Sequence, residues 1–417
     1  MKVRNIDLVD PDNYVHGVPF EWFDHLRHED PVHWHEEPLP NRGFWAITRY
    51  DDLVEVHRDW RTYSAQKGAV MLEELDEEQL ESRRSLIETD PPLHSELRAV
   101  TAKMFTKREV ARYEDRIRDI AKGLVDRALE LGELDVVMEL SRELPIRALC
   151  VMLGIPMGDV PKLVRWADAM VGNTDPEYAD LLVDRDDTEA YRFMPFRSPA
   201  GLEVFEYAQE LRRDRRANPR DDVMTVLANA TVGGEPMSDR EYNHYFSLLV
   251  VAGNETTRHT ISHGVIALAE NQGQLELFRT DPDGVSTTAA EEMIRWATPA
   301  MHFRRTATRD TELRGQPIRE GDKVVTWYIS ANRDETVFDD PYRFDITRSP
   351  NPQVAFGPQG ASLHFCLGAD LARLETRVMF EELVSRVRAV ELTGPYERLR
   401  SNFHNGIKHL PARLVPA

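Results

Sequence analysis

The chain is poor in cysteine, with only Cys150 and Cys366 among its 417 residues. Two thiols do not form the disulfide framework typical of small secreted domains. Long apolar runs are missing as well, since none approaches the ~20 residues that cross a bilayer. These absences exclude a disulfide-stabilised scaffold and predict a protein without a membrane span.

Positive charge is also scarce, because 52 basic residues face 72 acidic ones and the formal net charge is -20. Such a surface repels the phosphates of nucleic acid and an anionic membrane. The polar N-terminal segment lacks the apolar core of a signal peptide, and no Gly/Ser-rich or Pro-rich linker divides the chain. We therefore expect a soluble, cytoplasmic protein that binds no nucleic acid.

Helical periodicity dominates the sequence. Apolar residues recur at three- and four-residue spacing in 108–131, 202–215, 239–270, 286–297 and 368–390. Strand signals are short, with β-branched and aromatic enrichment in 43–50 and 323–330. The less regular segment 174–201 is expected to connect helices. The fold class predicted is mainly α with small β-sheets.

Cys366 lies in the loop "FGPQGASLHFCLG", directly before a strong helical pattern. The free N–H groups and dipole of a helix N-terminus favour a thiolate over a thiol. Gly360 and Gly368 allow close approach of a flat ligand, and His364 is placed to donate to an anionic group. A single thiolate suits one axial bond to haem iron better than zinc or an iron–sulfur cluster. The alternative for Cys366 is a buried cysteine at the start of a helix. Cys150, in an apolar helical stretch, is predicted to pack in the core.

Three other segments carry patterns that are ambiguous singly. In "AGNETT", Glu255 and Thr256 are predicted to lie in mid-helix, where Thr256 can bond back to the carbonyl of Ala252 and bend the helix. Glu292 and Arg295 are three apart on one predicted helix face, within ion-pairing reach.

His94 and Arg98 form the third pattern, four apart on a helix that Pro91 and Pro92 can begin. Two such donors on one face can hold a carboxylate. Taken alone, an exposed Glu255 and a helix-tolerated Thr256 explain the first pattern equally well, and an ordinary helix surface explains the Glu292–Arg295 and His94–Arg98 pairs better.

Together these motifs resemble the cytochrome P450 family of haem-thiolate monooxygenases, in family order and over nearly the whole chain. The resemblance implies one catalytic domain over 1–417, a triangular prism with haem b between a long central helix and the helix after the cysteine loop. It implies cofactor contacts by His94, Arg98, Ala252, Arg305, His364, Cys366 and Gly368, with Cys366 the iron ligand. Glu255 and Thr256 would deliver the protons that oxygen activation consumes, and Arg343 would join the structural Glu292–Arg295 pair.

The cysteine loop departs from the family pattern. Gln359 stands where the family has phenylalanine, and Ser362 replaces the second glycine. The upstream "AFGP" predicts a lengthened loop in which Phe356 is displaced, leaving the shielding of the sulfur in question.

The resemblance also implies the reaction and its partners. An apolar small molecule is hydroxylated, and NAD(P)H supplies electrons indirectly through a ferredoxin and a ferredoxin reductase, since no GxGxxG lies in the chain. The chain is expected to be a monomer. An acidic ferredoxin is expected to dock on the cysteine side, at Lys103, Lys107, Arg108, Arg373 and Arg377.

The sequence looks most like members that act on steroids, terpenoids and methyl-branched lipids. Its expected pocket walls are Val251, Ala252, Ala300, Met301, His302, Phe303 and Phe403. Two other functions stay open, a peroxide-driven haem-thiolate peroxygenase and a haem-thiolate sensor or binding protein without turnover. The intact Glu255–Thr256 pair argues against both.

Overall fold

The computed structural model describes residues 6–38 and 41–417, so the first five residues of the polar N-terminal segment lie outside it. About 51% of the chain is helical, which confirms a mainly α protein with small sheets. No helix in these ranges is both long and apolar enough to span a membrane. The α-helices are α1 Phe20–Glu29, α2 Tyr50–Arg58, α3 Glu77–Arg83, α4 Leu93–Thr101, α5 Lys107–Val110, α6 Glu114–Leu131, α7 Glu143–Leu153, α8 Val160–Val171, α9 Ala200–Ala217, α10 Val223–Ala228, α11 Asp239–Glu270, α12 Gln272–Thr280, α13 Pro282–Ala297, α14 Tyr328–Ala331 and α15 Ala369–Val384.

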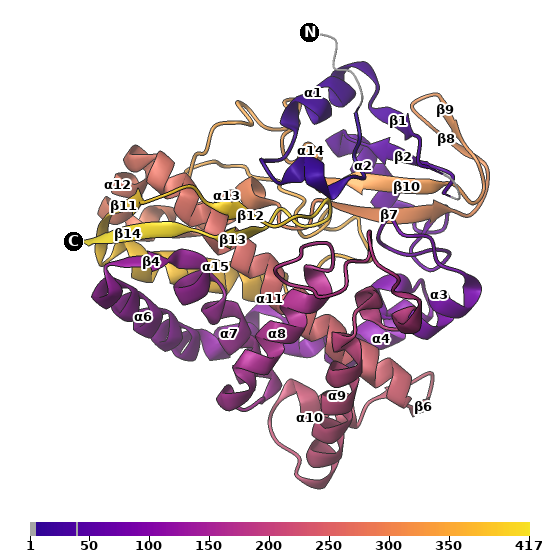
Figure 1. The fold of residues 1–417 in the computed structure, drawn as a ribbon, viewed down its shortest axis with the longest axis horizontal. Helices are drawn as coiled ribbons and strands as arrows, with labels where there is room; N and C mark the ends of the chain where they lie inside the picture. The colour runs from indigo at the N-terminus through magenta and orange to yellow at the C-terminus, as the bar shows by residue number, and fades with distance from the viewer. Residues whose placement is uncertain (1–5, 39–40) are drawn as a thin grey trace.

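The longest helix, α11, crosses the centre of the molecule and packs against α7, α8, α9, α13 and α15 (Figure 1). It begins at a capping box in which the Ser238 hydroxyl accepts from the Glu241 N–H and the Glu241 carboxylate accepts from the Ser238 N–H. Most of its side chains are buried, because helices surround it on several sides. This burial makes α11 the element from which the rest of the fold is positioned.

The strands form small sheets, of which the one containing β1, β2, β7 and β10 lies on the side of the molecule opposite α6–α10, whereas β4 and β14 lie beside α6 (Figure 1). The largest has the order β1-β2-β10-β7-β3, with β10 parallel to β2 and antiparallel to β7. A three-stranded sheet has the order β11-β14-β4. The strands are β1 Val32–His35, β2 Phe44–Ile47, β3 Tyr63–Ser64, β4 Glu133–Asp135, β5 Thr231–Val232, β6 Glu235–Pro236, β7 His302–Ala307, β8 Thr311–Leu313, β9 Gln316–Ile318, β10 Lys323–Trp327, β11 Val387–Leu392, β12 Glu397–Arg398, β13 Ile407–His409 and β14 Pro411–Pro416.

The sequence patterns located most elements, but several boundaries differ. The predicted helix 108–131 is interrupted by the 3₁₀ turn Ala111–Tyr113, and the predicted strand 43–50 ends at Ile47. The predicted helix 368–390 ends at Val384, and the chain continues as β11, which pairs with β14 with a register shift between Val387 and Ala389. The predicted strand 323–330 ends at Trp327 and turns into α14. The segment 174–201 contains only short 3₁₀ turns before α9 begins at Ala200, as expected of a connection.

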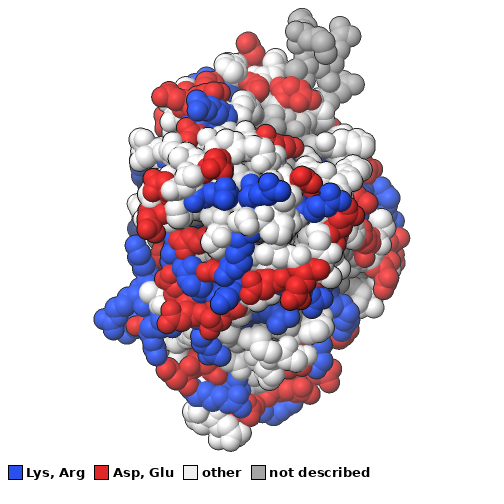
Figure 2. All heavy atoms as spheres, turned by 90° about the vertical axis from the view of Figure 1, so that its left-hand side faces the viewer, with Lys and Arg blue, Asp and Glu red and all other residues white. Residues whose placement is uncertain are grey.

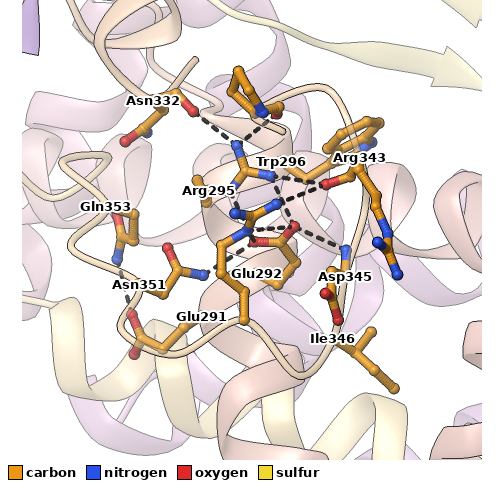
Figure 3. Close-up of polar contacts among 12 residues, drawn as sticks. Glu291, Glu292, Arg295, Trp296, Asn332, Arg343, Asp345, Ile346, Asn351 and Gln353 are labelled. Atoms are coloured by element: carbon orange, nitrogen blue, oxygen red, sulfur yellow. Dashed lines mark hydrogen bonds and ion pairs between the residues drawn. The ribbon is translucent and has the colours of Figure 1, made fainter. Parts of the chain in front are cut away.

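A buried ion pair ties α13 to the chain that leads to the cysteine loop (Figure 3). Both carboxylate oxygens of Glu292 bond the Arg295 guanidinium at 2.8 Å, and both side chains are fully buried. Arg295 also donates to the carbonyls of Asn332 and Pro341. The main-chain N–H of Asp345 donates to Glu292 at 3.0 Å.

The third charged partner is Arg348, whose Nε lies 3.2 Å from the Glu292 carboxylate. The prediction that the Arg343 side chain joins the pair is therefore wrong. Arg343 is exposed and offers only its carbonyl oxygen, 3.4 Å from Arg295, while its side chain points away (Figure 3). The cause is the chain reversal after Phe344, which brings Arg348 rather than Arg343 back to the carboxylate.

Removing these side chains should affect stability unequally. We expect Glu292→Ala to lower the free energy of unfolding by about 3–5 kcal/mol, because it leaves Arg295 buried without its counter-charge. Arg348→Ala should cost about 1–3 kcal/mol through lost charged hydrogen bonds. The matched control Arg343→Ala should stay within about 0.5 kcal/mol of the wild type. Denaturant titration measures all three, and a larger loss for Arg343→Ala than for Arg348→Ala would contradict the assignment.

Candidate functional site

A cavity lies between α11 and the loop that carries Cys366. Ala252, Gly253, Thr256, Thr257 and Thr260 of α11 form one wall. The opposite wall comprises Phe356, Gly357, His364, Phe365, Cys366, Leu367, Gly368, Leu371, Ala372 and Glu375. The central helix and the cysteine loop therefore face each other across one space, as the sequence motifs predict.

The Cys366 side chain faces this cavity and is exposed toward it. Its main-chain N–H donates to the Phe356 carbonyl at 2.9 Å, and α15 begins three residues later at Ala369. Burial within the protein raises the pKa of the Cys366 thiol, while the Gly368 N–H and the charges of Arg98 and Arg373 act in the opposite direction. The helix terminus alone therefore does not secure the thiolate, whereas a bound metal deprotonates a coordinating thiol outright.

One end of the cavity gathers nitrogen-bearing side chains from three distant segments. The rings of His94 and His364 lie 4.3 Å apart, and Arg98 and Arg305 line the same space. Both ring nitrogens of His94 and Nε2 of His364 are buried without a hydrogen-bond partner. Arg305, 5% exposed, donates to the carbonyl of Arg304. Burial, and to a lesser extent the charge of Arg98, lowers the pKa of His94 to about 4.

A second group of lining residues, called here the apolar end, carries no ionisable side chain. It comprises Val70, Leu86, Ile87, Leu248, Leu249, Pro299, Ala300 and Phe303. Of the predicted walls, Ala252, Ala300 and Phe303 line the cavity. Val251 and Met301 pack in the apolar core instead, and Phe403 packs edge-on against Phe303.

His302 also lies away from the cavity, with its ring 4.5 Å from that of Trp327. The reason is the twofold alternation of β7, which turns Phe303 and Arg305 toward the cavity and His302 toward the core. The predicted walls Val251, Met301, His302 and Phe403 are therefore corrected to neighbours of the site.

Thr256 bonds back to the carbonyl of Ala252 at 3.0 Å, as the sequence predicts, and lines the cavity. The adjacent Glu255 is 1% exposed and lies on another face of α11. Its carboxylate accepts from Arg258 at 3.1 Å and lies 3.5 Å from Nε2 of His259. The pair therefore combines one group in the cavity wall with one buried behind it.

The surroundings of Glu255 perturb its acidity. Burial raises the pKa of Glu255 to about 7, and the charge of Arg258 opposes this effect. Arg258 also bonds Asp168 of α8 and the hydroxyl of Tyr178, both at 2.5 Å. Asp168 and Tyr178 line a cleft at the surface, so Arg258 links Glu255 to two residues of that cleft.

The lengthened loop does not displace Phe356 from Cys366. Positive φ angles at Gly357 and Gly360, +83° and +74°, turn the added residues outward, and Gln359 is exposed. Phe356 lines the cavity and its carbonyl bonds the Cys366 N–H. The expectation that Phe356 is displaced is therefore wrong, because the extra length forms an outward turn.

Several residues on the cavity wall were missed by the sequence reasoning, among them Glu375 of α15 and Tyr328 of α14. Glu375 is fully buried with neither carboxylate oxygen in a hydrogen bond of normal geometry, and burial raises its pKa well above the ordinary value while the Thr257 hydroxyl opposes that shift. Helical spacing from the lining residues Gly368, Leu371 and Ala372 could have placed Glu375 on the cavity face, whereas nothing local distinguishes Tyr328.

Comparison with known proteins agrees with this geometry. The family model "Cytochrome P450" matches residues 287–402. The steroid C26-monooxygenase of Mycolicibacterium smegmatis is 38% identical over 97% of this chain and 92% of its own length. The methyl-branched lipid omega-hydroxylase of Mycobacterium tuberculosis is 42% identical over 93% of this chain and 89% of its own. The solved structure of Mycobacterium marinum cytochrome P450 CYP268A2 in complex with pseudoionone superposes with a TM-score of 0.89, at 39% identity, covering 99% of this chain and 100% of that one.

The chain belongs to the cytochrome P450 family and is a monooxygenase of that family. The family implies haem. The residues present fit that group, because the buried and unpartnered nitrogens of His94 and His364 require hydrogen-bond partners, and the charges of Arg98 and Arg305 beside them favour an anionic one. The carboxylates of haem would supply such a partner, and Cys366 lines the same cavity.

Proposed function

We propose that the protein inserts one oxygen atom from O2 into an unactivated C–H bond of an apolar small molecule, with residues 1–417 as one catalytic domain. The observation that carries the proposal is the single cavity that holds a lone thiol, an anion-binding end and an apolar end. In this role Cys366 ligates the iron, and His94, Arg98, Arg305 and His364 hold the haem carboxylates. Haem with a thiolate ligand supplies the activation of dioxygen.

The substrate is proposed to be a steroid, a terpenoid or a branched lipid. Two relatives are named for steroid and methyl-branched lipid oxidation, and a similar solved structure contains pseudoionone. The apolar end of the cavity supports this class, because its lining side chains from Val70 to Phe303 carry no ionisable group. An apolar molecule gains about 25 cal/mol per Å² of buried apolar surface there.

Thr256 and Glu255 are proposed to deliver protons. The Thr256 hydroxyl lines the cavity, while Glu255, with a pKa raised to about 7, can hold or release a proton near neutral pH. A peroxygenase needs no such pair, and a sensor without turnover needs no proton supply. The pair therefore favours the monooxygenase over both alternatives.

Electrons are proposed to come from NAD(P)H through a ferredoxin reductase and an acidic ferredoxin. Of the predicted docking residues, Arg373 pairs with Glu291, and Arg377 pairs with Glu114 and Glu381. Lys103, Lys107 and Arg108 are exposed, and α5, which carries the last two, packs on α15 beside the cysteine loop. Arg108 lies 3.5 Å from Glu109, so among these residues the positive charge that has no ion pair within residues 6–38 and 41–417 is that of Lys103 and Lys107. On the face of the molecule shown in Figure 2, by contrast, acidic and basic side chains are interspersed.

Exchanging the thiol tests the ligand assignment. Cys366→Ser should abolish the red-shifted Soret band that the reduced protein shows with carbon monoxide, since that band reports thiolate ligation. Cys150→Ala is the matched control, because Cys150 is fully buried in the apolar core. Retention of the band in Cys366→Ser would refute the proposal.

Removing the cavity hydroxyl should uncouple electron use from product formation. We expect Thr256→Ala to consume NADH while releasing several-fold more hydrogen peroxide per product, because a positioned proton donor contributes about 10²–10⁴-fold to a proton-transfer step. Thr256→Ser, which keeps the hydroxyl, should stay close to wild type. An unchanged ratio of product to NADH in Thr256→Ala would argue against the relay.

Charge reversal at α5 tests the docking site. The pair Lys107→Glu and Arg108→Glu should slow ferredoxin-to-haem electron transfer about tenfold at low salt, because steering depends on local charge. Raising the salt should shrink the difference, since the screening length falls from ~8 Å at physiological ionic strength to ~3 Å at 1 M.

The matched control for this charge reversal is the pair Arg309→Glu and Arg319→Glu. It changes the net charge equally at two exposed positions on the β7–β9 segment, away from α5. Equal slowing by both pairs would show that only the overall charge matters.

A further inference from the structure

Ser362 occupies the place in the cysteine loop where the family pattern has glycine, and its hydroxyl is bonded to a distant element. Nδ1 of His57, on α2, lies 3.3 Å from the Ser362 oxygen. The Ser362 oxygen in turn accepts from the main-chain N–H of His364 at 3.1 Å. A side chain from the N-terminal part of the fold thereby reaches the loop at Ser362, four residues before Cys366.

The other ring nitrogen of His57 meets two hydroxyl groups. Nε2 lies 3.1 Å from the Thr326 oxygen at the end of β10 and 3.0 Å from the Tyr328 hydroxyl. The Thr326 hydroxyl donates its own hydrogen to the Phe303 carbonyl at 3.0 Å. Thr326 can therefore only accept from His57, and on that contact we assign the hydrogen of the imidazole to Nε2.

The direction of the whole chain of hydrogen bonds follows from that assignment. Because Nε2 carries the hydrogen, Nδ1 accepts, and Ser362 must donate to it. His57 is buried, at 4% exposure, and burial together with the charge of Arg305 lowers its pKa well below the ordinary value. A neutral imidazole with one donor and one acceptor matches this arrangement.

The Tyr328 hydroxyl cannot donate to a nitrogen that already carries hydrogen. Its own hydrogen is therefore free, and Tyr328 lines the cavity at the end that holds Arg305. The same tautomer of His57 thus fixes the loop on one side and leaves a donor for the cavity on the other.

We propose that His57 is a positioning residue for haem binding, which holds the lengthened Cys366 loop through Ser362 and directs the Tyr328 hydroxyl into the cavity. In this loop a side-chain hydrogen bond does the positioning that a tight glycine turn does in the usual pattern. The inference rests on the proposed ligation of haem by Cys366.

The test measures the holoenzyme by two readouts besides activity, the carbon monoxide spectrum of the reduced protein and the rate of haem transfer to an excess of apomyoglobin. Ser362→Ala and His57→Phe should each raise the transfer rate about fivefold, the effect of one lost hydrogen bond. Both should increase the share of the band that lacks thiolate ligation. Ser362→Thr, which keeps the hydroxyl, should restore wild-type behaviour.

A double variant separates the proposed pathway from general loosening. If His57 acts through Ser362, the haem-transfer rate of the double variant His57→Phe, Ser362→Ala should exceed that of His57→Phe by less than twofold. Removing one partner already breaks the hydrogen bond. Tyr328→Phe should raise the transfer rate without changing the spectrum. Gln359→Ala, an exposed position in the same loop, is the control and should change neither readout.

Three results would overturn the inference: wild-type readouts in Ser362→Ala, fully additive effects in the double variant, or an equal effect of Gln359→Ala. The failure of the proposed function looks different, because the wild type itself would then lack the red-shifted band. A normal wild-type spectrum with an unaffected Ser362→Ala would leave the function standing and remove only the role of His57.

Discussion

The position of the cysteine loop depends on the burial of one carboxylate. Glu292 has no exposed surface, and an unpaired charge there would cost several kcal/mol. It is neutralised by Arg295 from its own helix and by Arg348, and it also accepts from the Asp345 N–H. These partners fasten the segment 332–351 to α13.

From that segment the chain runs directly into the loop. The Val354 N–H donates to the Asn332 side chain at 2.8 Å, and the Gln353 amide donates to Glu291 at 3.0 Å (Figure 3). The main chain just before Phe356 is therefore held in place, and the Phe356 carbonyl accepts a hydrogen bond from the Cys366 N–H. A buried ion pair well outside the cavity thus determines where the thiol lies.

The sequence predicted what local spacing controls. The family motifs are each a few residues long. They placed Cys366, His364, Arg98 and Thr256 around one cavity, because the spacing of residues along an element decides which side chains share a face. The sequence did not predict contacts between segments that are far apart in the chain and are brought together by folding. Arg348 replaces Arg343 through a chain reversal, and His57 reaches Ser362 across 305 residues.

The central helix shows the same limit on a smaller scale. Ala252, Thr256 and Thr260 recur every four residues and face the cavity, whereas Glu255 and Arg258 lie on another face. The spacing of Glu255 and Thr256 indicates two functional groups. Only the packing of α8 shows that Asp168 shares Arg258 with Glu255 and so helps to set its acidity.

The loop contributes to the site by geometry rather than by electrostatics. Burial raises the pKa of the Cys366 thiol despite the nearby charges of Arg98 and Arg373. In the proposed ligation, coordination to the metal would convert that thiol to the thiolate. The chain supplies the position of the thiol through two hydrogen bonds. The Cys366 N–H donates to the Phe356 carbonyl, and the Arg98 guanidinium donates to the Phe365 carbonyl at 2.7 Å. A loop lengthened by an outward turn can therefore keep the family's chemistry, provided that both ends of the turn stay anchored.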